Sequence, residues 1–108
     1  NNKKIKVSKK KKIEGCLFAT GGKKETNLSL LTRKSGSAAL DMAYVAAGRY
    51  DGYFQNNLNL WDIAAGIIII KEAGGIVNDI NLSENDNIKV RASSDAINHQ
   101  MLEKLKNF

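Results

Sequence analysis

Apolar residues recur along this chain in short runs and in one long run, separated by glycines and polar clusters. Short apolar runs bounded by turn residues are typical of strands, and apolar positions that recur every three to four residues are typical of helices. Strands are expected at residues 5–7, 13–20, 53–54, 76–80 and 88–92. Helices are expected at residues 38–47, at residues 62–73 and after residues 93–95. This order predicts an α/β fold, a layered sheet of mostly parallel or mixed strands with helices on both faces.

The first expected helix begins after Ser35-Gly36-Ser37 and ends before Gly48, which we expect in the left-handed conformation that glycine adopts readily. We expect Asp41 to point away from its apolar face. That face is expected to comprise Ala38, Ala39, Leu40, Ala43, Tyr44 and Ala47. Residues 55–57 are expected to form a loop after the short strand, and residues 23–31 are weakly patterned, with one or two helical turns at most.

The long apolar run starts directly after Asp62 and contains no polar side chain from residue 63 to residue 70. Its length, its alanines and a carboxylate at its start favour a helix over a buried strand. A helix that is apolar all round is expected to be buried on several sides. Gly66 within it indicates close packing against a neighbouring backbone, and Gly74-Gly75 is expected to end it.

Asp62 has two interpretations from its position alone. As an N-cap it accepts a hydrogen bond from the first turn of the helix, which is the commoner meaning of such a residue. As a ligand it uses one carboxylate oxygen to bind a divalent cation. Gly36, Ser37 and Ala38 present the same choice, because backbone N–H groups at a helix start bind anions or simply receive a cap.

Other reactive side chains point to ordinary structural roles. Cys16 is expected to be an inert core thiol, and His99 a solvated surface residue without metal-ligating partners. Trp61 is expected in the core or in an interface. No histidine stands in a position to activate a serine, so the sequence gives no support for a serine hydrolase.

The 108 residues suit a single domain, residues 1–108, and the formal net charge of +6 is concentrated at one end. Seven of the 17 basic residues are lysines within residues 1–12, which we interpret as a basic strand or loop exposed to solvent. The apolar runs are too short to cross a membrane. The single cysteine favours a reducing compartment, and a cytoplasmic location is expected.

Two motifs carry a family resemblance. Gly36-Ser37-Ala38-Ala39-Leu40-Asp41-Met42-Ala43-Tyr44-Val45-Ala46-Ala47-Gly48-Arg49 precedes Asp51-Gly52-Tyr53-Phe54. The second motif is Trp61-Asp62-Ile63-Ala64-Ala65-Gly66, continuing to Glu72-Ala73-Gly74-Gly75. In order and spacing they resemble the inositol monophosphatase family, in particular its bacterial SuhB-like branch. The resemblance covers residues 33–108 well and residues 13–22 less specifically.

This resemblance implies a Mg²⁺-dependent phosphomonoesterase that hydrolyses inositol monophosphate or a related sugar phosphate with a metal-activated water. It assigns Asp62 to the metal, and Gly36, Ser37, Ala38 and Gln55 to the substrate. In the family a glutamate commonly stands where Gln55 stands, so an inositol preference is in question.

The resemblance also implies that this chain is the C-terminal half of the family's αβαβα sandwich. The remaining metal ligands would lie in the N-terminal half, so the 108 residues alone are expected to be inactive. We expect a homo-oligomer and no role for nucleic acid. The alternative is a non-catalytic module that binds RNA or another acidic partner through its lysines, with an affinity that falls steeply with salt.

Overall fold

The computed structural model describes residues 5–21, 30–78, 80 and 85–106. Within them a five-stranded sheet has the order β2-β1-β3-β5-β4. The strands are β1 Leu17–Ala19, β2 Leu31–Arg33, β3 Gly52–Leu58, β4 Gly75–Val77 and β5 Ile88–Ser94. The helices are α1 Ala38–Ala46, α2 Leu60–Glu72, the 3-10 turn η1 Asp95–Ile97 and α3 Asn98–Lys104.

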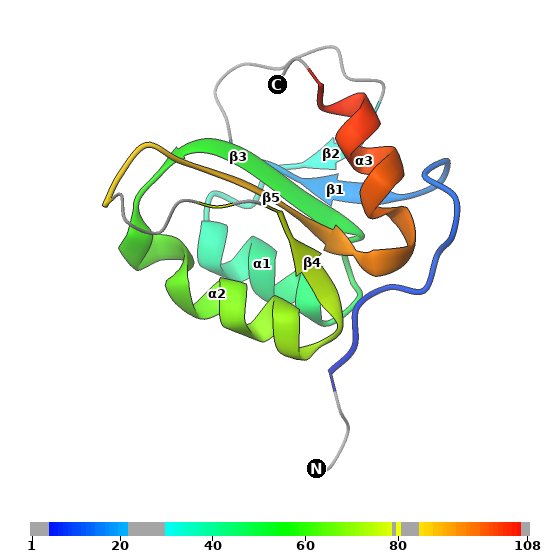
Figure 1. Cartoon of the computed structure of the whole chain (residues 1–108), viewed down its shortest axis with the longest axis horizontal. Helices are drawn as coiled ribbons and strands as arrows, with labels where there is room; N and C mark the ends of the chain where they lie inside the picture. Colours follow the sequence, from blue (N-terminus) through cyan, green and yellow to red (C-terminus); the bar gives the residue numbers. More distant parts are fainter. Residues whose placement is uncertain (1–4, 22–29, 79, 81–84, 107–108) are drawn as a thin grey trace.

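The sheet is mixed, with helices on both of its faces (Figure 1). Strand β1 runs parallel to β2 and to β3, whereas β5 runs antiparallel to β3 and β4. Helices α1 and α2 cover one face side by side, and α3 covers the other (Figure 1). This arrangement confirms the expected α/β class.

Two hydrophobic cores lie on the two faces of the sheet, because successive side chains of a strand point to opposite faces. In β3, Tyr53 joins the core under α1 and α2, and its neighbour Phe54 joins the core under α3. In β1, Ala19 and Phe18 divide in the same way. The central strands therefore hold both helical layers in place.

Helix α1 has the expected ends but a different buried face. Ser37 is its N-cap, with Oγ accepting from the backbone N–H of Leu40 at 3.1 Å, and Gly48 follows its C-terminus with φ of +79°. The buried residues are Asp41, Met42, Val45 and Ala46, so the predicted face and the solvent-facing Asp41 are both wrong. Because alanines are spread around this helix, its sides differ little in hydrophobicity. The larger Met42 and Val45 then decide which side is buried.

Helix α2 starts earlier than expected. Asn59 is the N-cap, its Oδ1 accepting from the backbone N–H of Asp62 at 3.3 Å, so the prediction that Asp62 caps the helix is wrong. The helix ends with Gly74 at φ of +92°.

Burial of α2 is one-sided, which contradicts the expected burial all round. Its buried residues recur every three to four positions, at Ile63, Gly66, Ile67 and Ile70. Gly66 does mark close packing as predicted, because a Cβ there would lie 2.8 Å from Cβ of Met42 on α1. Because apolar residues lie all around this helix, the sequence pattern could not show which side faces solvent.

Strand boundaries also differ from the pattern. Residues 5–7 form no strand, and β2 at Leu31–Arg33 lies where no strand was expected. Strand β3 continues to Leu58 through the predicted loop at residues 55–57, because Gln55 and Leu58 both pair with β5, on either side of an irregularity in the register. The strand expected at residues 76–80 is the shorter β4, and residue 79 lies outside the described residues.

The last strand and helix follow the prediction more closely. Strand β5 includes Ser93 and Ser94, which therefore lie in the sheet and give η1 no side-chain cap. Ile97, Met101 and Leu105 are buried. Residues 22–29 and Phe108 lie outside the described residues.

Candidate functional site

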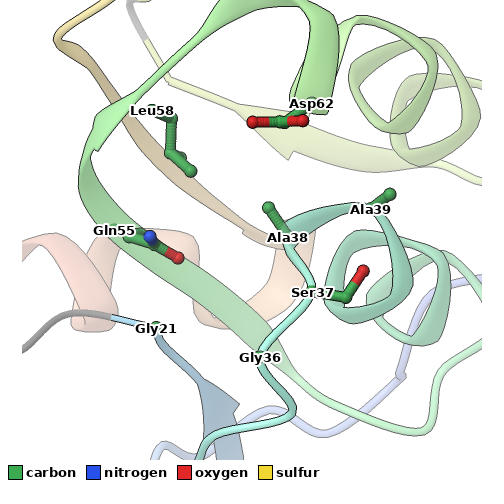
Figure 2. Close-up of a pocket in the computed structure, with 8 residues that line it drawn as sticks. All are labelled: Gly21, Gly36, Ser37, Ala38, Ala39, Gln55, Leu58 and Asp62. Atoms are coloured by element: carbon green, nitrogen blue, oxygen red, sulfur yellow. The ribbon is translucent and has the colours of Figure 1, made fainter.

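A cavity of about 320 Å³ lies between the sheet and the starts of α1 and α2 (Figure 2). It is lined by Gly21, Gly36, Ser37, Ala38, Ala39, Gln55, Leu58 and Asp62. Asp62 comes from the first turn of α2, Gln55 from β3, and Gly21 from the segment after β1 (Figure 2). All five residues singled out in the sequence thus meet in one cavity, although they are spread over positions 36 to 62.

The start of α1 forms one wall of this cavity. Gly36 has φ of +87°, and a Cβ built there would meet no other atom within 4 Å, so this turn faces open space. Ser37 caps the helix with its hydroxyl, while Ala38 and Ala39 contribute only small side chains to the wall. The first backbone N–H groups of a helix and its dipole favour an anion or an electron-rich oxygen at this position.

Gln55 lies on β3 and is held by a neighbour on the same face of that strand. The hydroxyl of the fully buried Tyr53 donates to Oε1 of Gln55 at 2.5 Å. Gly21 lies against the same amide, and a Cβ at residue 21 would collide with it. The sequence analysis missed both neighbours, although the two-residue spacing of Tyr53 and Gln55 on a strand is a signal for one shared face.

Asp62 is exposed, and among the residues that line the cavity it is the one with a charged side chain. Because Asn59 caps α2, the carboxylate of Asp62 is not needed for capping. The described residues contain no group of three or more His, Cys, Asp or Glu side chains arranged to hold a metal ion. Mg²⁺ commonly keeps several waters and takes one or two carboxylates together with substrate phosphate oxygens. Asp62 therefore fits one ligand of such an ion, and the described residues do not supply a complete set.

Asp41 is a buried acid that the sequence analysis placed in solvent. Its side chain is buried in the first turn of α1, and Oδ1 has no hydrogen-bond partner within the described part of the chain. Burial raises the pKa of Asp41 above its ordinary value, while a hydrogen bond from Ser35 opposes the shift. Burial raises the pKa of Tyr53 as well, and the charges of Asp41 and Asp62 add to the effect, so the Tyr53 hydroxyl keeps its proton.

The outer side of α2 is an apolar surface beside the cavity. Trp61, the residue before Asp62, is 92% exposed, and Ile68 and Ile69 are 59% and 38% exposed. Leu40 on the neighbouring α1 is 43% exposed. Trp61 is therefore not a core residue. Of the two positions predicted for it, core or interface, the interface stays a prediction. None of the helices in the described part of the chain has the length and hydropathy of a membrane span.

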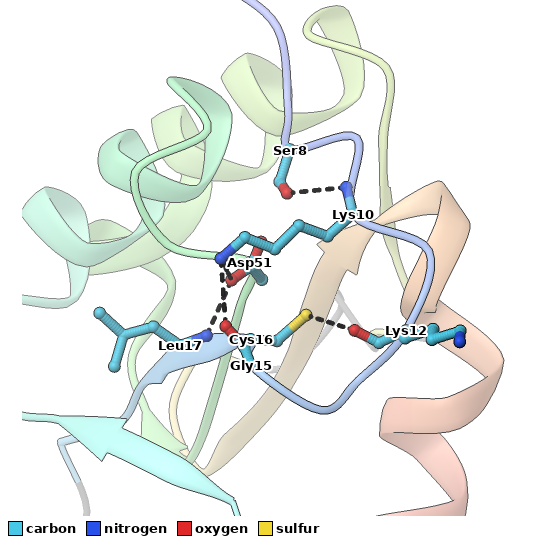
Figure 3. Close-up of polar contacts among 7 residues, drawn as sticks. All are labelled: Ser8, Lys10, Lys12, Gly15, Cys16, Leu17 and Asp51. Atoms are coloured by element: carbon cyan, nitrogen blue, oxygen red, sulfur yellow. Dashed lines mark hydrogen bonds and ion pairs between the residues drawn. The ribbon is translucent and has the colours of Figure 1, made fainter.

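The described part of the basic segment, residues 5–12, is irregular and tied to the fold at Asp51 (Figure 3). Oδ2 of this buried aspartate accepts from Lys10 Nζ at 3.3 Å and from the backbone N–H of Leu17 at 2.8 Å. Lys9, Lys11 and Lys12 remain exposed. Part of this segment is therefore bound to the domain and has a structural role.

Cys16 is a buried thiol beside this basic segment. Its Sγ donates to the carbonyl oxygen of Lys12 at 3.2 Å. Burial, together with the nearby charge of Asp51, raises the pKa of Cys16 to about 11. A thiol held in its protonated form is a poor nucleophile, which agrees with the inert role expected for it. His99 is exposed, also as expected.

Fold and cavity together define a layered α/β domain with a ligand-sized cavity at the starts of two helices. The model of the inositol monophosphatase family matches residues 1–107, and the chain belongs to this family. It is 49% identical over 76 residues to an inositol-1-monophosphatase of Mesorhizobium japonicum and 42% identical over 96 residues to the Nus factor SuhB of Pasteurella multocida. The expected family, with its SuhB-like relatives, is thereby confirmed.

A solved structure gives the same fold. The inositol monophosphatase of Anabaena (Nostoc) sp. PCC 7120 superposes on 98% of this chain with a TM-score of 0.83 and 29% identity. The chain covers 51% of that structure, and the alignments cover 68% and 75% of this chain but 29% and 36% of the Mesorhizobium and Pasteurella proteins. It therefore spans about half or less of the length of the relatives that it matches.

Proposed function

We propose that this chain forms part of a Mg²⁺-dependent phosphomonoesterase that hydrolyses inositol monophosphate or a related sugar phosphate. The observation that carries the proposal is the convergence of Asp62, Gln55 and the Gly36–Ala38 turn on one cavity. Membership of the inositol monophosphatase family and similarity to a protein named inositol-1-monophosphatase support the same activity.

In this proposal Asp62 holds one Mg²⁺ ion through its carboxylate. When bound, Mg²⁺ supplies a Lewis acid that lowers the pKa of a water and offsets the charge that develops on the leaving oxygen. Gly36, Ser37 and Ala38 form the wall against which the alcohol part of the substrate lies, close to the N–H groups at the start of α1. Gln55 hydrogen-bonds a polar group of the same part of the substrate.

The site needs groups from outside the described residues, since Asp62 is a single carboxylate ligand. We propose that the remainder of the family fold supplies them and that it packs on the outer side of α2, next to Asp62. Exposed Trp61, Ile68 and Ile69 support this packing, because an apolar surface beside an incomplete site is typical of an interface. The complete assembly here means this chain together with that remainder, and we expect the 108 residues alone to be inactive.

The experiment that tests the activity compares Asp62→Asn with the unaltered chain in the complete assembly. We expect kcat to fall about 100-fold or more, because the amide carries no charge for the metal. Asp95→Asn, which alters an exposed aspartate in η1, is the matched control and should leave kcat unchanged. Turnover by Asp62→Asn equal to that of the unaltered assembly would contradict the assignment of Asp62.

The packing surface is tested with the fluorescence of Trp61, the single tryptophan of the chain. Addition of the remaining half, prepared with no tryptophan of its own, should shift Trp61 emission to shorter wavelength as its ring leaves water. Ile68→Ser should weaken this association, whereas Lys104→Ser, an exposed change on α3, should not. An unchanged emission spectrum on formation of an active assembly would exclude this surface.

Three further expectations stay predictions, namely the homo-oligomer, the cytoplasmic location and the absence of a role for nucleic acid. The alternative of RNA or acidic-partner binding also stays a prediction. Exposed Lys9, Lys11 and Lys12 are compatible with it, but the tie between Lys10 and Asp51 gives part of the tract a structural role.

A further inference from the structure

The hydrogen bond from Tyr53 to Gln55 sets which end of the Gln55 amide is available to a ligand. Tyr53 is fully buried, and its hydroxyl lies 2.5 Å from Oε1 of Gln55. In this hydrogen bond the hydroxyl is the donor and Oε1 is the acceptor. A glutamine amide has one acceptor oxygen and two N–H donors. With Oε1 engaged by Tyr53, the group left for recognition is the N–H donor pair.

The surroundings hold the amide in this orientation. Gly21 lies against it so closely that a Cβ at that position would collide with the amide group. Within the described residues, Nε2 of Gln55 makes no hydrogen bond to the protein, and Gln55 lines the cavity. The donor pair is therefore available to a ligand in the cavity, on a side chain packed between Gly21 and the Tyr53 hydroxyl.

The charges near Gln55 also favour an electron-rich group. The lining residues other than Asp62 are uncharged, and the start of α1 directs its positive dipole end toward the same cavity. The one negative lining group, Asp62, is the proposed metal ligand, whose charge the metal offsets. A carboxylate on the substrate would thus meet amide N–H donors and a helix N-terminus.

We propose, on the basis of the phosphatase function above, that Gln55 acts as a hydrogen-bond donor and that the site accepts phosphate monoesters whose carbon skeleton carries a carboxylate. Tyr53 is the positioning residue that orients the Gln55 amide. A glutamate at residue 55 would reverse this preference, because a carboxylate there repels an acidic substrate and accepts hydrogen bonds from the hydroxyls of a neutral polyol.

The experiment uses two esters that differ in a single group. 2-Phosphoglycerate carries a carboxylate where glycerol 2-phosphate carries a hydroxymethyl group. We expect the complete assembly with Mg²⁺ to give a kcat/KM for the acid at least equal to that for the alcohol. The quantity followed is the acid-to-alcohol ratio of kcat/KM, because a general loss of folding or metal lowers both values together.

Four variants separate donation, charge and orientation. Gln55→Glu should lower the ratio about 10- to 100-fold, the range expected when a charged group loses its partner and meets a like charge. Gln55→Leu, which removes the donors without adding charge, should lower it about 10-fold. Tyr53→Phe should lower it a few-fold, roughly 3- to 10-fold, by releasing the amide. The matched control is Tyr50→Phe, whose ring packs on Tyr44 away from the lining residues, and it should leave the ratio unchanged.

The outcomes distinguish this inference from the function on which it rests. Activity on either ester with a ratio that stays the same in Gln55→Glu and Gln55→Leu would overturn the donor role of Gln55 and leave the phosphatase proposal standing. A higher ratio in Gln55→Glu would overturn it too. Absence of phosphatase activity on both esters and on inositol monophosphate would overturn the proposed function and the inference together.

Discussion

The two faces of the sheet differ in how completely this chain covers its own groups. Under α3, Ile97, Met101 and Leu105 are buried against the aromatic pair Phe18 and Phe54. A polar network closes the same side, since Asn98 accepts from Ser93 and exchanges hydrogen bonds with Asn78 across 3.0 Å. These hydrogen bonds join α3 to β5 and to the segment after β4.

The face under α1 and α2 also has a hydrophobic core, but apolar side chains on its outer side are exposed and, within the described part of the chain, a buried polar atom lacks a partner. The buried Asp41 leaves one oxygen without a partner in the described residues, and the outer side of α2 exposes Trp61, Ile68 and Ile69. The cavity with Asp62 and Gln55 lies on this face as well. The difference agrees with the proposal that the α1–α2 face, and not the α3 face, takes part in binding and assembly.

The largest effect on folding is expected on the α3 face. Met101→Ala should lower the free energy of unfolding by about 2–5 kcal/mol, because a fully buried side chain leaves a cavity. Urea unfolding of the purified chain measures it, with the exposed Lys104→Ala on the same helix as control. If Met101→Ala lowered the free energy of unfolding no more than Lys104→Ala does, the tight packing of α3 on the sheet would be contradicted.

A smaller loss is expected where α1 meets α2. In Gly66→Ala the new Cβ would lie 2.8 Å from Cβ of Met42, a position that cannot move without shifting α1. Overpacking costs about 1–3 kcal/mol and the alanine gains about 1 kcal/mol of helix propensity, so a net loss of about 1 kcal/mol is expected. The same urea measurement on exposed Ala65→Ser should show less change. A Gly66→Ala chain more stable than the unaltered one would contradict close helix contact.

Asp41→Asn should stabilise the chain near neutral pH, by about 1 kcal/mol, because it removes a buried charge that lacks a partner on Oδ1. Burial raises the pKa of Asp41 above 3.8, so the folded chain holds this proton more tightly than the unfolded chain does. The free energy of unfolding therefore falls as pH rises from 3.8 through the raised value. Melting curves at several pH values should show the Asp41→Asn advantage at neutral pH and its disappearance below pH 3.8. An advantage that is independent of pH would contradict the buried charge.

The smallest effect on folding is expected on the outer side of α2. Ile68→Ser should change the free energy of unfolding by about 0.5 kcal/mol or less, because this side chain is already 59% exposed. Its neighbour Ile67, only 4% exposed, is the matched control, and Ile67→Ser should destabilise the chain strongly. Equal losses for the two serines in urea unfolding would remove the distinction between the two sides of α2.

Particular residues show how far the sequence carried these conclusions. Ser37 as a cap, Gly48 and Gly74 as helix stops and Gly66 as a close contact follow from local chemistry, and the structure confirms each. The five candidate site residues were selected by a family resemblance, and their meeting in one cavity agrees with that choice. The interpretation of Asp62 as a cap was wrong because the helix begins earlier, with Asn59, three residues before Asp62, as its N-cap.

By itself, the sequence determined the family, the α/β class and the helix stops at Gly48 and Gly74, because these depend on local propensities and on motifs of fixed spacing. Only the tertiary structure decided which side of α1 and of α2 is buried, since both helices are apolar around most of their circumference. It likewise decided that Asp41 is buried and that Gln55 is oriented by Tyr53. Such contacts depend on which strands and helices become neighbours. The residue pattern of a single helix or strand does not determine its neighbours.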